Sequence, residues 1–498
     1  MKIKIKNSIT FLKYFFFFLF VFSIPFQKRH IFSDYPIAGE FNEWTAISIY
    51  VSDILLFLSL IFWLGELVIS RNHLRLRNII TPLNLPLSGE KYTPLIRGVR
   101  GVLNYFREGI LNLKKKNKLL IIGYWLLVTL LAIAFFSLIN AQNLNIALFR
   151  LLKLGEVILL FIFVVFNFGS KKLRLLLYLF LLTSGIVQGM IAVGQYFHQH
   201  SLGLKILGEN DLAPNIIGVA KIVVNGDKII RAYGAFPHPN ILGGFSIAAI
   251  LFCFYLWTKI PKVKWDKSLK IILLIILSLF TITITITFSR TAWLGLIIAL
   301  LGLLIINLHK IKNYVPVFGV IIITALILFY FLQPQILTRQ TISDSSGDFA
   351  LTNRAFLNQI ALLIIAKHPL LGVGIGNFVP SIPDFTPLDS KHLTGFTKMN
   401  LPAWRYQPSH NLYLAMASET GLPSLLIFLT FLYLTIAHAL GQIRNDPEIG
   451  ILFWILIAYL FISCLDHYFY DLQQGILLFW LILGIIWVII LQKSKNVA

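Results

Sequence analysis

The sequence predicts an all-α polytopic membrane protein with about twelve transmembrane helices. Of its 498 residues, 57% are hydrophobic and only 13% are charged, and the mean hydropathy of +0.79 lies far above that of soluble globular domains. The apolar residues gather in segments close to the roughly 20 residues that a helix needs to cross a bilayer. Basic residues concentrate in alternate connections between these segments.

The first apolar segment follows a basic start, as in a signal peptide, but no small-x-small cleavage site follows Phe26. We therefore expect a retained first span. The alternating Thr-Ile run at 281–286 has the period of a strand, yet an isolated strand in lipid would leave its backbone unpaired, so we expect a helix there. The twelve predicted spans are 8–26, 45–69, 119–139, 147–168, 173–196, 240–257, 269–288, 291–308, 315–332, 411–438, 449–465 and 473–491.

The distribution of lysine and arginine orients these spans. The connection 71–118 carries eleven Lys or Arg against two acids, whereas the segment 333–409 carries six against four. The positive-inside rule then places both termini and the 71–118 loop in the cytoplasm. Most of the net charge of +22 is explained by topology and by attraction to anionic lipid, so we expect no nucleic-acid partner. The two cysteines, Cys253 and Cys464, lie in apolar spans and indicate neither a disulfide framework nor a zinc site.

Two segments on the predicted outer face, 197–239 and 333–409, are long enough to form structure around a single integral membrane domain, 1–498. Within the second, which separates spans nine and ten, residues 353–366 have helical periodicity and predict a short interfacial helix or a lid, ended by His368-Pro369. The sequence GVGIGNF at 372–378 lacks a dinucleotide-binding context and predicts a tight turn.

Three residues that can carry positive charge fall at membrane boundaries on this outer side: Arg231 before span six, Arg290 between spans seven and eight, and His410 before span ten. Arg290 is the only formally charged residue between Ile271 and Leu308. Each alone has a structural explanation, such as an arginine at an interface or a histidine in a surface loop. Together they indicate a site for a polyanionic head group, because arginine matches phosphate oxygens and histidine can act as a base near neutral pH.

Four segments, RAYGAFPHPNILGGF, TFSRTAWLG, NRAFLNQIALLIIAKHPLLGVGIGNF and SHNLYLAMASETG, resemble in order and position the signature segments of the O-antigen ligase and polymerase superfamily of bacterial membrane proteins. The resemblance covers roughly residues 140–490. It implies a GT-C-like glycosyltransferase of the inner membrane that moves a glycan from a polyprenyl (undecaprenyl) diphosphate carrier to an acceptor hydroxyl on the outer side. It also implies that Arg231 and Arg290 bind the diphosphate and that His410 acts on the acceptor hydroxyl.

Further candidates for binding the diphosphate or glycan have structural explanations that are at least as good. Glu419 could orient His410 or cap a helix, His238 and Asn240 could shape the first outer loop, and Lys153 could simply pair with Glu156 three residues on. The complete set of these candidates is Arg150, Lys153, His238, Asn240, Arg354, Asn411 and Glu419.

The sequence does not distinguish between a lipid core, a growing glycan and a protein hydroxyl as the acceptor. The 77-residue outer segment favours a ligase over a polymerase. No DxD pair of the kind that holds a divalent ion is present, so we expect neither a metal nor another cofactor. Two other functions compete with transfer. A transporter, for example of inorganic carbon, would be expected to place ionisable groups near the bilayer midplane, and a non-catalytic assembly partner would tolerate loss of all three cationic residues.

Overall fold

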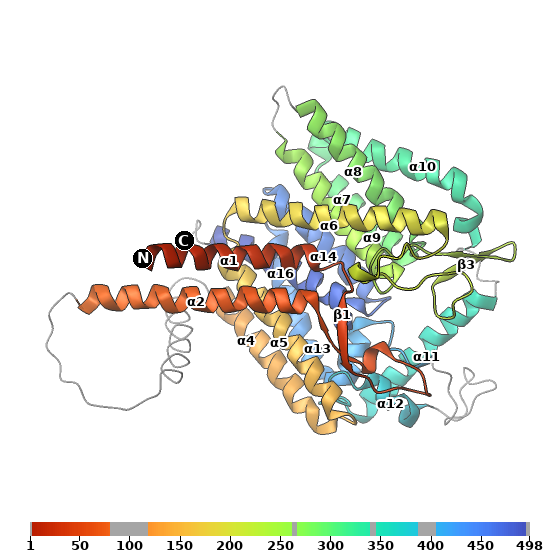
Figure 1. Cartoon of the computed structure of the whole chain (residues 1–498), viewed down its shortest axis with the longest axis horizontal. Helices are drawn as coiled ribbons and strands as arrows, with labels where there is room; N and C mark the ends of the chain where they lie inside the picture. The colour runs from red at the N-terminus through yellow and green to blue at the C-terminus, as the bar shows by residue number, and fades with distance from the viewer. Residues whose placement is uncertain (1, 80–117, 261–265, 339–344, 387–404, 495–498) are drawn as a thin grey trace.

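The computed structural model describes residues 2–79, 118–260, 266–338, 345–386 and 405–494. These residues form mainly long helices that run between two ends of the molecule. Both chain termini lie at one end, and β3, α11 and α12 lie at the opposite end, which we call the distal end (Figure 1).

The described helices that correspond to predicted spans are α1 (Lys2–Ser23), α2 (Val51–Ile79), α4 (Lys118–Ser137), α5 (Leu144–Asn167), α6 (Lys171–His198), α7 (Pro239–Lys259), α8 (Asp266–Ile286), α9 (Arg290–Ile306), α10 (Val315–Thr338), α13 (Leu412–Leu440), α14 (Pro447–Ser463) and α16 (Gln473–Ser494). The remaining described helices are α11 (Ser345–Lys367) and α12 (Phe378–Phe385), both at the distal end, and the short α15 (Tyr468–Asp471).

Each of the twelve predicted spans falls largely on one of these helices. Among the described residues, eight helices are long and apolar enough to cross a membrane, and α9 and α14 are shorter apolar helices. The protein is therefore a polytopic, mainly helical membrane protein, while the count of twelve spans stays a prediction. The Thr-Ile run lies inside α8, as expected from the need to satisfy its backbone.

Two short antiparallel hairpins depart from the all-helical prediction: β1 (Arg29–Ser33) with β2 (Ile47–Tyr50), and β3 (Lys221–Val224) with β4 (Asp227–Ile230). The prediction of a span starting at residue 45 is therefore wrong for its first six residues. The β-branched residues of this stretch pair with β1. The helix begins only at Val51, where Asp53 accepts a hydrogen bond from the backbone N–H of Tyr50.

The helices differ in how much of their surface the protein covers. The protein buries 94% of the 18-residue apolar stretch of α16 and 83% of that of α7, but only 11% of that of α10. A helix that is apolar on all sides and buried belongs to the centre of a bundle. Aromatic rings fill this centre, with Phe431 stacked on Trp487 at a centroid distance of 5.2 Å. The exposed apolar surface of α10 suits contact with lipid.

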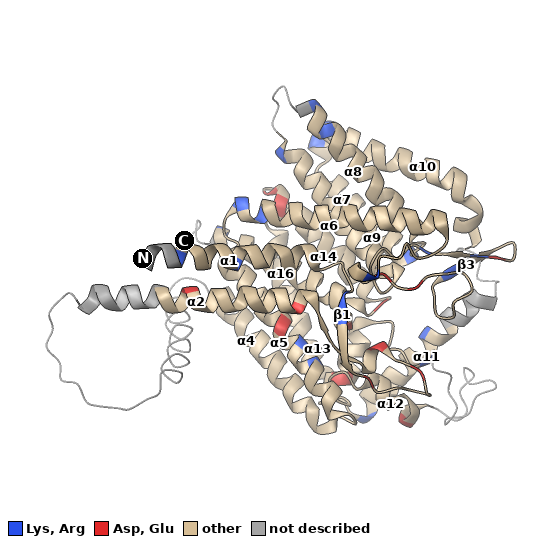
Figure 2. Cartoon of the chain, in the orientation of Figure 1, with Lys and Arg blue, Asp and Glu red and all other residues tan. Residues whose placement is uncertain are grey.

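Charged residues are sparse along the middle of the bundle (Figure 2). Two buried ion pairs are present there, as expected because an isolated charge in an apolar interior is costly. Arg174 donates from Nε and Nη2 to the carboxylate of Glu448 at 2.7 and 3.0 Å, and Tyr178 donates to the same carboxylate at 2.8 Å. Lys13 of α1 pairs with Glu66 of α2 at 2.6 Å, which joins the first two helices.

The distal segment between α10 and α13 packs onto a break in α13. Helix α11 has 23 residues, so the prediction of a short helix at 353–366 is wrong in length, although the helix ends before His368-Pro369 as expected. The turn predicted at 372–378 is present. The N–H groups of Val373 and Gly374 donate to the carbonyls of Ser418 and Glu419 in α13.

This docking requires glycine on both sides. Gly421 breaks the helix with φ of 85°, and a Cβ there would lie 2.1 Å from the carbonyl oxygen of Leu370. Gly372 has a φ of 61°, and a Cβ on this residue would lie 2.3 Å from the carbonyl oxygen of Ser418. Only glycine adopts such a conformation at so close an approach without strain.

Candidate functional site

The candidate site lies at the distal end, where three helices begin. The N-terminal ends of α7 and α9 pack together, since a Cβ on Gly243 would touch Ala292 and Ser289. The first turn of α13 joins them through the loop after α14, because Asn411 donates to the carbonyl of Cys464 at 3.1 Å. A helix N-terminus carries partial positive charge, so three together favour an anion.

Arg231 is buried beside this junction and is held by two hydrogen bonds. Its Nε donates to the carbonyl of Thr287 in the α8–α9 turn at 2.6 Å, and its Nη2 donates to Oδ1 of Asn240 at 2.6 Å. Arg290, half-buried, is the first residue of α9, three positions after Thr287. The structure therefore brings both predicted arginines to the same turn.

Asp466 connects this turn to His410. Its Oδ2 accepts a hydrogen bond from Nδ2 of Asn240 at 2.7 Å, and its Oδ1 lies 3.6 Å from Nδ1 of His410. The backbone N–H of His467 donates to Oδ1 at 2.9 Å. Arg231, Asn240, Asp466 and His410 thus form one continuous row of polar groups from α7 to α13.

The row sets the protonation of its members. Burial lowers the pKa of His410, and the neighbouring Asp466 carboxylate only partly opposes this, so the imidazole is neutral at and somewhat below its usual pKa. Burial alone would raise the pKa of Asp466, but His410 beside it holds that pKa well below the usual range. The pair therefore offers a charged carboxylate next to a neutral imidazole that can accept a proton.

Helix α11 closes the site from the distal side. Ser409, next to His410, donates to Oδ1 of Asn358 at 2.7 Å, which fixes the loop before α13 onto α11. One turn earlier in α11 is Arg354, whose charge contributes to lowering the pKa values of both His410 and His238. Arg354 therefore acts electrostatically on both histidines of the site.

Comparison with known protein families finds a match for part of the chain. Residues 273–429 match the O-antigen ligase family. This match supports the resemblance of the chain to the O-antigen ligase and polymerase superfamily. No curated protein matches the chain. The matched segment runs from α8 into α13 and includes Arg290, Arg354 and His410, whereas Arg231 and Asp466 reach the O-antigen ligase segment from elements on either side of it.

Asp466 and His467 were missed in the sequence. They stand in SCLDHYFYD, directly after a predicted span that ends on the outer side. A signal for these two residues was available in the sequence. An acidic residue stands beside a histidine at the same membrane boundary as the predicted cationic residues.

The other candidates occupy structural positions around this row of polar groups. His238 caps α7 by accepting the N–H of Asn240 at 3.1 Å, and Asn411 caps α13. Burial lowers the pKa of His238 to about 3. Glu419 accepts hydrogen bonds from the N–H of Gly376 and from the hydroxyl of Tyr470, both at 2.9 Å, so its described contacts secure the distal turn rather than orient His410.

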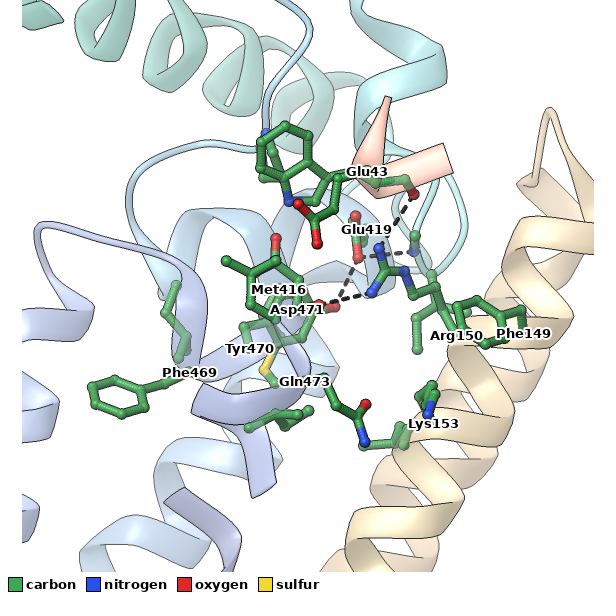
Figure 3. A pocket seen from close by; sticks show the side chains of 18 of the residues that line it. Glu43, Phe149, Arg150, Lys153, Met416, Glu419, Phe469, Tyr470, Asp471 and Gln473 are labelled. Atoms are coloured by element: carbon green, nitrogen blue, oxygen red, sulfur yellow. Dashed lines mark hydrogen bonds between the residues drawn. The ribbon is translucent and has the colours of Figure 1, made fainter. Parts of the chain in front are cut away.

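Arg150 and Lys153 lie on α5, apart from the row. Lys153 pairs with Glu156 at 3.1 Å, as the spacing predicted, and also contacts Asp53 of α2. Arg150 donates to the carbonyls of Asp471 and Trp44 at 2.7 and 3.2 Å. Both lie in the first half of α5 and line a cavity (Figure 3).

Within the described residues, His410, Asp466 and His467 could together offer three ligand atoms to a metal ion, all within 4.8 Å of one another. The carboxylate is already used by Asn240 and the N–H of His467, and Nδ1 of His467 bonds to Asp471 at 2.8 Å. Nearby guanidiniums also oppose a further cation. This donor set suits a hydrogen-bonded acid-base group better than a divalent cation site.

Proposed function

We propose that the chain is a metal-independent, GT-C-type glycosyltransferase similar to O-antigen ligases. It moves a glycan from a polyprenyl diphosphate carrier to an acceptor hydroxyl on the outer side of the bacterial cytoplasmic membrane. Both termini and the 71–118 loop are cytoplasmic in this proposal, and the segments 197–239 and 333–409 face outward around one integral membrane domain of twelve spans. The row from Arg231 to His410 is the observation that carries it.

The cationic part of the row suits the diphosphate. Arg231 and Arg290 lie at the turn where α9 begins, and the charge of Arg354 acts on His410. Near a low-dielectric wall the attraction of these guanidiniums for phosphate oxygens exceeds that in bulk water. As the bond between the anomeric carbon and the diphosphate breaks, its electron pair stays on the diphosphate oxygen. Fixed positive groups stabilise that charge most where it develops, in the transition state.

The other end of the row suits the acceptor. The acceptor hydroxyl oxygen forms the new bond to the anomeric carbon, and its proton passes to Nε2 of His410. In the resting site this nitrogen lies 3.3 Å from the side-chain oxygen of Gln407. Asp466, on the Nδ1 side, then stabilises the imidazolium. General-base catalysis of this kind contributes typically about 10²- to 10⁴-fold in rate.

Three related activities differ in the acceptor that they use: ligation to a glycolipid, polymerisation of repeat units, and transfer to protein. The size of the outer segment favours ligation. A transporter would place its ionisable groups at mid-membrane, whereas the row lies where helices begin, so transport is not favoured.

The test uses the purified protein with a polyprenyl-diphosphate-linked glycan and candidate acceptors, followed by identification of the product. Arg290→Ala and His410→Ala should each abolish or strongly reduce transfer, with carrier binding kept only in the histidine variant. Lys172→Ala, exposed at the start of α6, is the matched control. Full transfer by Arg290→Ala, or loss of transfer in EDTA, would contradict the proposed diphosphate role or the metal independence respectively.

A further inference from the structure

A second cavity lies at the end of the bundle opposite the row from Arg231 to His410. Its lining comes from the last turns of α7 and α9, from the first turns of α8, α10 and α14, and from the loop between α13 and α14. In α7, Asn240 of the row and Trp257 of the cavity are seventeen positions apart, or about 25 Å along the helix axis. This distance is most of the roughly 30 Å thickness of a bilayer's hydrocarbon core.

Three cations line this cavity: Lys270 of α8, Lys310 after α9, and Arg444 before α14. No acidic residue is among the described residues that line it. Within the described part of the chain, none of the three cations forms an ion pair. Like charges around a common space repel one another, so an anion that enters this space is attracted by all three.

Two acids close to Arg444 in the sequence are already paired with other cations. Asp446 accepts from Nζ of Lys493 at 3.1 Å, and Glu448 accepts from Arg174 at 2.7 Å. The helix ends add little net charge, because three helices end around the cavity and three begin there. The positive charge of the lining is therefore balanced neither by the described side chains nor by the helix dipoles.

The aromatic residues around these cations are fixed by contacts within the protein. Nε1 of Trp257 donates to the carbonyl of Asn313 at 2.7 Å, which ties the end of α7 to the turn before α10. Nζ of Lys270 lies 5.5 Å from the centre of the Trp257 ring, and Tyr314 stacks on Phe254 at a centroid distance of 6.2 Å. Tryptophan and tyrosine are enriched where lipid head groups meet hydrocarbon, so this lining suits head-group depth.

An apolar surface leads from the cavity along α10. Phe318 lines the cavity, and Ile322 and Leu326 follow it at intervals of four residues, on the same face of the helix. Ile322 and Leu326 are 55% and 62% exposed. A hydrocarbon chain that starts in the cavity can therefore lie along this face, whereas a free phosphate ion would leave it uncovered.

We propose that this cavity binds the head group of an anionic phospholipid. Lys270, Lys310 and Arg444 bind the phosphodiester, since ammonium and guanidinium groups hold phosphate oxygens, and one acyl chain lies along Phe318 and Ile322. In the proposed topology the lipid belongs to the cytoplasmic leaflet, where anionic lipids attract basic residues. The assignment is independent of the transferase function, because the cavity shares no residue with the row.

Native mass spectrometry of the full-length protein, titrated in detergent with dioleoyl phosphatidylglycerol, measures the affinity for the tightest-bound lipid. Each basic residue near an anionic lipid contributes about fivefold, so Lys270→Gln with Lys310→Gln should weaken binding about 25-fold. Lys270→Arg with Lys310→Arg keeps both charges and should retain the affinity. The matched control is Lys171→Gln with Lys172→Gln, at the exposed start of α6, which removes the same charge and should change the affinity by less than about twofold.

Two further ligands separate this lipid from related molecules. Dioleoyl phosphatidylcholine has the same hydrocarbon without net charge and should bind at least about tenfold more weakly. Glycerol phosphate has a phosphate ester without hydrocarbon and should not displace an equal concentration of the phosphatidylglycerol.

Three results would overturn the proposal. Equal affinity for the two lipids would mean that the cavity does not recognise the anionic head group. An unchanged affinity in the glutamine variant, or an equal loss in that variant and its control, would place the tightest lipid elsewhere. Displacement by glycerol phosphate would mean that the cavity takes a soluble phosphate ester instead of a lipid.

Discussion

Replacing Asp466 with asparagine most directly tests the catalytic role proposed for the row from Arg231 to His410. The Oδ1 to Nδ1 distance of 3.6 Å is too long for a hydrogen bond, so the carboxylate acts on the imidazole mainly through its charge. With an effective dielectric constant of about 20, that charge stabilises an imidazolium at this distance by about 4 to 5 kcal/mol. Since about 1.4 kcal/mol corresponds to a tenfold change in rate, the upper limit of the effect is about 10³-fold.

The substitution has a second effect in the same direction. An asparagine amide can donate to Nδ1 of His410, which would place the imidazole proton on Nε2 and block that nitrogen as a base. We expect kcat to fall about 10²- to 10³-fold with carrier binding little changed. The assay is single-turnover transfer of a labelled glycan, with Asp227→Asn in the exposed β3–β4 hairpin as the control. A kcat within about threefold of the unmodified protein would refute the role of Asp466.

Three further predictions concern pH, the α7 cap and the α13 break. Because burial lowers the pKa of His410, the rate of transfer should stay constant as pH falls through 6.5 and decline only at lower pH. Asp466→Asn removes the carboxylate that opposes this lowering, so in a pH–rate profile the variant's rate should decline at a still lower pH. The pKa of His238 is lowered to about 3 in the folded protein, so its contribution to stability is fully present above its unfolded pKa and is lost as pH falls from about 6.5 to 3. His238→Asn should keep the helix cap and flatten this loss of stability in thermal unfolding, whereas His238→Ala should cost about 1 kcal/mol of stability. Equal melting of both variants would contradict the capping role. Gly421→Ala should lower stability by roughly 2 kcal/mol or more, because it adds both a strained φ and a close contact, while Gly441→Ala near the end of the same helix, with open space around it, should melt like the unmodified protein.

The sequence was most informative about the helices, because the length and composition of an apolar segment are local properties. It also placed Arg231, Arg290 and His410 on one side of the bundle, since alternating basic connections order the helix ends. The strand Ile47–Tyr50 was not predicted from the sequence. Its residues continue an apolar segment, and only pairing with Arg29–Ser33 makes them a strand.

The contacts within the site could not be read from the sequence. Asn240 and Asp466 are 226 residues apart, and their hydrogen bond depends on how the starts of α7 and α15 are packed. The sequence offered Glu419 as one candidate for orienting His410. The break at Gly421 instead directs Glu419 toward the N–H of Gly376, which leaves Asp466 beside the histidine.

The two facing glycines, Gly372 and Gly421, make the distal segment and α13 one mechanical unit, although a membrane boundary separates them in the predicted topology. A chimera that exchanges residues 345–409 alone between relatives would therefore carry one half of this joint without the other. Such a hybrid should misplace the base even if every residue of the row were retained. Engineers who wish to transplant the outer segment would need to cut after residue 421 and move the beginning of α13 with it.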